Sequence, residues 1–173
     1  MKSIACILAP VLMLTVLLAA APATKPAGQT IADSKGDFTI TIPPTWKQGT
    51  LKRDGLRVMG PPPAGTRAYP MFQAQRGLQP DAADKPLDDS AKAIIEQVTK
   101  RPVAETKIAT LKLDGVDARQ FKVTLTADDK PVDFDYVIAI NKSQLFVLNF
   151  MQEQSHYDAA AAQAVIDSFR WSK

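Results

Sequence analysis

The sequence has few of the residues that enzymes use as nucleophiles or proton carriers. Its only histidine is His156 and its only cysteine is Cys6. Nucleophilic catalysis requires a serine, cysteine or threonine beside a general base. No serine of this chain lies in a nucleophile-elbow sequence, and we expect His156 to be a solvated residue in the first turn of the last helix. The sequence therefore predicts a protein that is not an enzyme and that carries no cofactor.

Two aspartates are the best candidates for a metal site. Asp133 and Asp135 lie two residues apart in a predicted strand, so their side chains share a face. Carboxylate oxygens are ligands for hard cations such as calcium, although no EF-hand spacing is present. We interpret both carboxylates as solvated charges near a strand end, which discourage pairing at a sheet edge. A divalent-metal site at Asp133 and Asp135 is the weaker alternative.

The segment Gly60–Pro70 is the best candidate for a contact surface. Four prolines and two glycines interrupt it, and it also contains Arg67 and Tyr69, which are good anchors at protein interfaces. It is too rich in proline to present successive N–H groups to a phosphate. Trp46 follows the first predicted strand and is expected to fold over the edge of the core nearby. We expect Trp46, Arg67 and Tyr69 to lie near a partner contact; an ordinary variable loop is the alternative.

The net charge of +3 is small, and the chain has no basic run and no interleaving of basic and aromatic residues. Nucleic-acid binding proteins need such a basic surface. The sequence therefore predicts no nucleic-acid partner.

The N-terminal segment is predicted to be a signal peptide, residues 1–23. Lys2 precedes an uncharged apolar run at residues 4–21, which ends in small residues. We expect cleavage after Ala23, with Ala20 as the alternative, and a secreted or periplasmic protein. The other alternative is an uncleaved membrane anchor formed by residues 4–21. Cleavage would remove Cys6, so the mature chain would have neither a thiol nor a disulfide.

The apolar stretch Val132–Phe150 is expected to form the central hairpin of the fold. Residues 24–35 are small and polar and predict a flexible tether. Residues 36–173 are expected to form a single domain.

Alternating or continuous apolar residues predict seven strands. They cover residues 36–43, 56–59, 71–77, 105–113, 116–126, 132–140 and 145–150. Within the strand at residues 116–126, the apolar residues switch from even to odd positions near Arg119, which suggests a bulge.

Two helices are predicted, at Leu87–Lys100 and Ser155–Phe169. Asp88 or Asp89 is expected to cap the first helix, and Ser155 with Asp158 to form a capping box in the second. The central strands are apolar on both faces and need cover on both. The predicted fold is therefore α+β, an antiparallel sheet of about seven strands with a helix on each face. A sheet with both helices on one face is the alternative.

The chain resembles the PsbP-like family of small exported proteins, which includes the bacterial DcrB-like proteins of the cell envelope. The resemblance is carried by the opening strand with its prolines and tryptophan, the middle helix, the hairpin and the end of the last helix. These are residues 37–46, 87–100, 136–148 and 166–170. The resemblance implies an antiparallel sheet between helices and a role in binding or assembling other proteins.

Taken together, these observations predict an exported, non-enzymatic module that binds an envelope protein. The alternative is a periplasmic protein that binds a small ligand or a divalent metal between the sheet and a helix.

Overall fold

The predicted central hairpin lies in the middle of a seven-stranded antiparallel sheet. The computed structural model describes residues 28–51, 54–66, 68–77, 85–100 and 106–173. The hairpin strands are β8 (Lys130–Asn141) and β9 (Gln144–Glu153), and the strand order is β3-β4-β5-β9-β8-β7-β6. The other strands are β3 (Lys47–Gly49), β4 (Gly55–Met59), β5 (Met71–Arg76), β6 (Ile108–Leu113) and β7 (Val116–Ala127).

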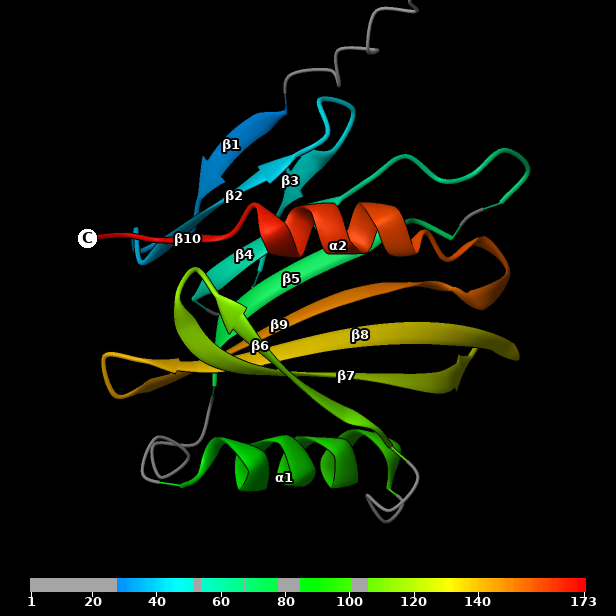
Figure 1. Ribbon diagram of the computed structural model, residues 1–173. Helices are drawn as coiled ribbons and strands as arrows, with labels where there is room; N and C mark the ends of the chain where they lie inside the picture. The colour runs from blue at the N-terminus through cyan, green and yellow to red at the C-terminus, as the bar shows by residue number, and fades with distance from the viewer. Residues whose placement is uncertain (1–27, 52–53, 67, 78–84, 101–105) are drawn as a thin grey trace, which may run out of the picture.

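The central strands are apolar on both faces because two separate cores meet there. In β8, Val137 and Ala139 face one core and Ile138 faces the other, and all three are fully buried. In β9, Leu148 pairs with Val137 and extends the first core. The predicted α+β sheet of seven strands is confirmed, with one helix on each face (Figure 1).

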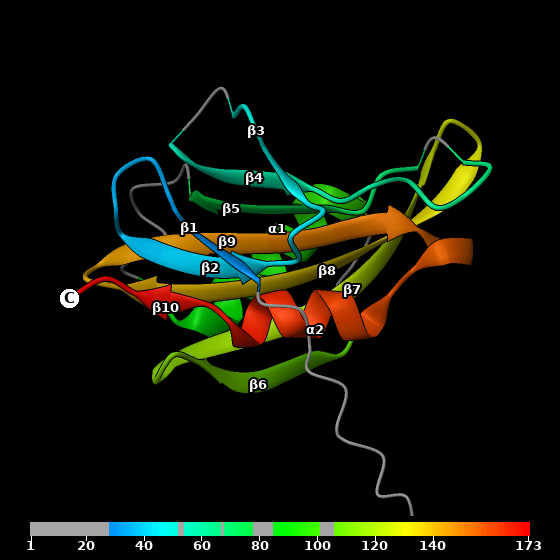
Figure 2. The ribbon, with the colours of Figure 1, turned by 90° about the horizontal axis from the view of Figure 1, so that it is seen from above.

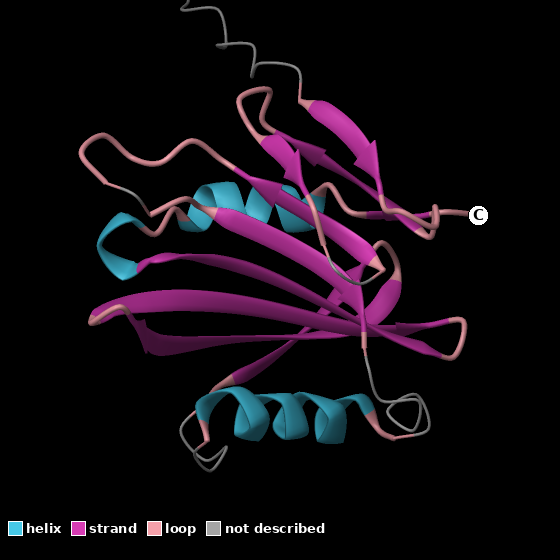
Figure 3. Cartoon of the chain, turned by 180° about the vertical axis from the view of Figure 1, so that it is seen from behind, coloured by secondary structure: helices cyan, strands magenta, loops and turns pink. Residues whose placement is uncertain are grey.

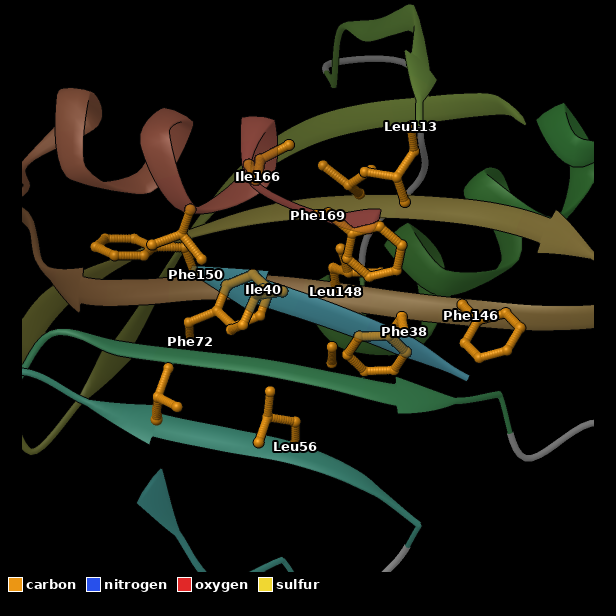
Figure 4. Packing of buried hydrophobic residues seen from close by; sticks show 14 of the residues in the cluster. Phe38, Ile40, Leu56, Phe72, Leu113, Phe146, Leu148, Phe150, Ile166 and Phe169 are labelled. Atoms are coloured by element: carbon orange, nitrogen blue, oxygen red, sulfur yellow. The ribbon is translucent and has the colours of Figure 1, made fainter. Parts of the chain in front are cut away.

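A second, three-stranded sheet covers the first core together with the last helix. It consists of β1 (Gln29–Ala32), β2 (Phe38–Ile42) and β10 (Arg170–Trp171), in the order β1-β2-β10. Helix α2 (Ala159–Asp167) lies beside this sheet (Figure 2). Phe38 of β2 stacks on Phe169 with ring centroids 4.8 Å apart, and Figure 4 shows both rings against β9.

The opposite face is covered by α1 (Leu87–Thr99), which packs against β7 and β8. Ala91 and Ile95 on its inner face are fully buried in the second core. Figure 3 shows α1 and α2 on opposite sides of the sheet.

Two predictions about the N-terminal part are wrong. Residues 29–32, expected in a flexible tether, form β1, and Thr30 Oγ1 lies 3.1 Å from Thr41 Oγ1 of β2. This strand is mostly exposed, so it carries no apolar alternation that the sequence could show. The strand predicted at residues 36–43 is β2, which belongs to the three-stranded sheet and not to the main sheet. Its buried face packs onto the main sheet in the first core. Residues 1–27, which contain the predicted signal peptide and the start of the predicted tether, lie outside the described residues.

The predicted helix caps are also wrong in part. Asp158, not Ser155, caps α2, accepting a hydrogen bond of 2.9 Å from the backbone N–H of Ala161. Residues Gln154–His156 form a separate 3₁₀ turn, η3. Helix α1 has no side-chain cap, because its N-cap residue is Pro86, whose side chain cannot accept a hydrogen bond. Asp88 lies inside the first turn and accepts hydrogen bonds from Arg119.

No bulge interrupts β7, whose pairing with β6 and β8 is continuous. The apolar residues switch from even to odd positions because the strand contacts both cores. Ala118 faces the first core, whereas Phe121 and Val123 face the second.

Candidate functional site: a groove between the proline loop and the last helix

The segment Gly60–Pro70 connects β4 to β5 and is closed at its base by a hydrogen bond. The Gly60 N–H donates to the Pro70 carbonyl oxygen at 2.9 Å. A Cβ atom at Gly60 would lie 2.6 Å from the Trp46 indole, so only glycine fits there. Within the loop, the Thr66 N–H and hydroxyl both donate to the Pro63 carbonyl at 3.0 Å. The loop therefore has a fixed base packed against Trp46.

Of the three residues predicted near a partner contact, the structure places two. Trp46 is only 7% exposed and stacks on Phe150, with centroids 6.0 Å apart. It supports the loop from the core rather than offering a free surface. Tyr69 is 52% exposed. Arg67 lies outside the described residues.

Beside the loop lies a hollow of about 350 Å³ that the sequence did not reveal. Its walls are the loop prolines on one side and the start of α2 on the other, with Trp46 between them. The lining residues are Thr45, Trp46, Pro61, Pro62, Pro63, Pro70, Gln152, His156, Asp158 and Ala161.

A second hollow, of about 500 Å³, continues along α2. It is lined by Pro43 and Pro44 after β2 and by the alanine-rich face of the helix, and it shares Asp158 and Ala161 with the first hollow. We call the two together the α2 groove. The small side chains of Ala160, Ala161 and Ala164 leave it open, and its walls are mainly apolar. Such a surface suits an extended segment with small or apolar side chains.

The approach to α2 is fixed by a polar cluster around the two predicted metal ligands. Asp133 and Asp135 share a face, as predicted. Asp133 is only 3% exposed, so the expectation that it is solvated is wrong. It accepts hydrogen bonds of 2.7 Å from Thr124 Oγ1 and pairs with Lys122 Nζ at 2.7 Å. Burial opposes ionisation, but the hydrogen bonds from Lys122 and Thr124 outweigh it and lower the pKa of Asp133.

Asp135 shows the opposite balance. Gln120 donates to its carboxylate at 3.0 Å and the Tyr157 hydroxyl donates at 3.3 Å. Burial nevertheless dominates and raises the pKa of Asp135. Lys122 Nζ lies 3.8 Å from the centre of the Tyr157 ring, a cation–π contact. The cluster thus ties the segment before α2 to strands β7 and β8.

These contacts leave the two carboxylates engaged by the protein itself. A divalent cation at Asp133 would have to displace the Lys122 ammonium. Among the described residues, no group of three histidine, cysteine, aspartate or glutamate side chains could hold a metal ion. His156 lies in η3 rather than in a helix, with Nδ1 2.9 Å from Ser155 Oγ, and its side chain borders the α2 groove.

The opposite face of the sheet holds a smaller cavity of about 220 Å³ under α1. Helix α1 packs over β7 and β8 and leaves space above β5 and β9. Polar lining comes from Gln75, Arg76, Lys85, Ser90, Gln97, Tyr136 and Asn149. Lys85 and Arg76 are its cationic residues, and its lining contains no carboxylate.

Comparison with known proteins identifies the fold. No protein-family model and no curated protein matches the sequence. Among solved structures, cyanobacterial PsbP from Synechocystis matches with a TM-score of 0.58 and 13% identity over 90% of this chain and 99% of that one. A protein from Bacteroides thetaiotaomicron matches with a TM-score of 0.57 and 13% identity over 85% of this chain. This chain spans about half (49%) of the Bacteroides protein.

No described helix is long and apolar enough to cross a membrane. At this level of identity the likeness concerns the fold alone, and the DcrB-like part of the predicted resemblance stays a prediction. The chain has a PsbP-like fold.

Proposed function

We propose that this protein is a non-enzymatic module of the cell envelope that binds an extended polypeptide segment of another envelope protein in the α2 groove. The observation that carries the proposal is the groove itself. Two adjoining hollows run along α2, bordered by prolines on one side and alanines on the other. The ring of proline fixes its φ angle and alanine has no side-chain rotamers, so such walls lose little conformational entropy when a partner packs on them.

The surroundings of the groove support a protein partner. Tyr69 stands exposed on the loop that forms one wall, and tyrosine is enriched at interface hot spots. The loop base and the segment before α2 are each held by contacts to the core. The predicted signal peptide directs the protein to the envelope, which is where the partner would be found.

The substitution Ala161→Glu tests this proposal. Ala161 lies in the first turn of α2 and lines both hollows, so a glutamate there would occupy the groove. A negative charge in the first turn of a helix is favourable for the helix, so the fold should be retained. We expect the variant to lose the partners that the wild-type protein retains in a pull-down from envelope extract.

The matched control is Ala109→Glu on the exposed edge strand β6. It introduces the same side chain away from the groove and should leave the partner profile unchanged. Equal profiles for wild type and Ala161→Glu would contradict the assignment of the groove.

The cavity under α1 supports a second candidate function, the binding of a small anion. Its single lysine and its amide side chains suit a small carboxylate or a phosphate. A ligand that binds only the folded state must raise the melting temperature. A panel of small carboxylates and inorganic phosphate should therefore give a shift that Lys85→Ala removes, and no shift with any member would reject this candidate.

A further inference from the structure

The methionines of the folded part occupy one row of the main sheet. The sequence contains five methionines, and Met1 and Met13 lie in the predicted signal peptide. The other three are Met59, Met71 and Met151. Met59 pairs directly with Met71 across β4 and β5, and Met71 pairs directly with Met151 across β5 and β9. Directly paired residues on antiparallel strands project from the same face, so the three methionine side chains leave the sheet on one face. The end of the Met59 side chain lies toward Gly49 of β3.

This face is the one on which α1 lies, but the helix does not cover the row. The neighbouring residues Phe72 and Phe150 point into the first core, so the methionines point the other way. Helix α1 packs on β7 and β8, whereas the row lies on β4, β5 and β9. Met59 is 37% exposed, and Met71 and Met151 are partly exposed. The sulfurs are therefore accessible to a small ion.

One sulfur lies beside a polar side chain on the same face. The side-chain amide of Gln73 lies 3.1 Å from Met71 Sδ. Gln73 is two residues further along β5, so it projects from the same face as Met71. Met71 Sδ thus lies over the sheet and not in the first core.

Aromatic rings continue the row beyond Met151. Met151 pairs with Phe134 of β8. The Phe134 ring stacks on Tyr136 at 6.2 Å, and Tyr136 stacks on Phe121 at 5.2 Å. The faces of aromatic rings attract cations. At the other end Lys47 pairs with Met59, and Arg57 lies on the same face of β4 with its guanidinium 2.9 Å from the Gln73 amide. No carboxylate or imidazole belongs to the row.

We propose that Met59, Met71 and Met151 form a three-thioether site for a soft monovalent cation, copper(I) or silver(I). Thioether sulfur is a soft, uncharged ligand that selects copper(I) over the hard and borderline divalent ions. The outer strands β4 and β9 are roughly 10 Å apart, two strand spacings. Methionine has three rotatable side-chain bonds, so the outer sulfurs can lean toward Met71 without movement of the backbone.

The ligand type also sets the pH dependence. A thioether does not titrate, so cation binding should be the same from about pH 5.5 to pH 8. Sites made of histidine, cysteine or carboxylate lose affinity as those ligands take up protons. The proposal is independent of the α2 groove, which lies on the other face of the sheet.

The test is a titration of the full chain carrying Cys6→Ser, so that no thiol competes. Silver(I) is the redox-stable probe, and copper(I) is added without oxygen against a chromophoric copper(I) chelator. We expect one ion per chain, a joint shift of the three methionine methyl signals in the NMR spectrum, and an affinity independent of pH.

The variants Met59→Leu and Met71→Leu conserve side-chain volume and remove one sulfur each. Each should weaken binding by about tenfold or more, while Gln75→Leu on β5 should not. Met59 is partly exposed, so its variant keeps the test valid if Met71→Leu destabilises the fold. Binding that is equal in the two methionine variants and the wild type, or that weakens on acidification, would overturn the proposal, as would no binding at all.

Discussion

Two neighbouring carboxyl groups on one strand have pKa values that are shifted in opposite directions. Asp133 and Asp135 lie on one face of β8, but Asp133 pairs with Lys122 whereas Asp135 receives only neutral donors and is more affected by burial. A carboxyl with a lowered pKa stabilises the fold above its unfolded pKa, and this contribution is lost as the pH falls through the folded pKa. A carboxyl with a raised pKa instead costs stability, and the cost develops as the pH rises through its folded pKa.

These opposite signs give a prediction for the two asparagine variants. At neutral pH, Asp133→Asn should lower the free energy of unfolding by about 1–3 kcal/mol, because Lys122 loses its charged partner. Asp135→Asn should leave it unchanged or raise it. Urea denaturation at a series of pH values provides the measurement. The difference for Asp133→Asn should shrink as the pH falls below about 4, whereas the difference for Asp135→Asn should already shrink as the pH falls toward about 4. Equal effects of the two substitutions at neutral pH would contradict this account.

At this scale the sequence predicted the shared face of Asp133 and Asp135 but not their burial. Burial results from the segment at residues 154–157, which folds over the strand ends and brings Tyr157 to Asp135. Nothing in the local pattern of β8 indicates that contact. The cap of α2 was not apparent from the local pattern either. Asp158 was expected to complete a capping box with Ser155, but it is itself the capping residue.

At the scale of the elements, the central strand β9 and the proline loop should differ sharply in their effect on stability. Leu148 of β9 is fully buried in the first core. Leu148→Ala should lower the free energy of unfolding by about 2–5 kcal/mol, because the cavity that it leaves cannot collapse between two covered faces. Phe146→Ala on the same strand is expected to behave in the same way.

The matched change in the loop is Tyr69→Ala, which removes a side chain that is 52% exposed. It should alter the free energy of unfolding by no more than about 0.5 kcal/mol. Chemical denaturation of the three variants checks the contrast. A large loss in Tyr69→Ala would mean that the loop is part of the core and not a contact surface.

The strands could be predicted where burial of one or both faces leaves a repeating or continuous pattern of apolar residues in the sequence. Strands β2, β4, β5, β7, β8 and β9 show apolar alternation or continuous apolar runs and were found. Strand β6, predicted at residues 105–113 from fewer apolar residues, was found as well. Strands β1 and β3 are short and mostly exposed, so no hydrophobic pattern marks them. The methionine row needs the strand register, because its residues are 12 and 80 positions apart along the chain.

At the scale of the whole molecule, the two faces of the sheet have separate roles in this account. One face carries the second sheet, α2 and the groove, whereas the other carries α1, its cavity and the methionine row. The layered α+β architecture follows from two-sided apolar strands and could be predicted. The groove could not, since it arises where the proline loop, the Pro43–Pro44 turn and α2 meet, three segments far apart in the sequence.

The central claim is that a polypeptide of another envelope protein lies in the α2 groove, and site-specific photocrosslinking in intact cells tests it most directly. A photoreactive phenylalanine analogue replaces Tyr69 on the loop that forms one wall of the groove or, as a control, Lys112, whose side chain is 63% exposed on β6. We predict a discrete crosslinked product from position 69 that Ala161→Glu abolishes, and none from position 112. The same products from both positions, or a product at position 69 that persists with Ala161→Glu, would contradict the account.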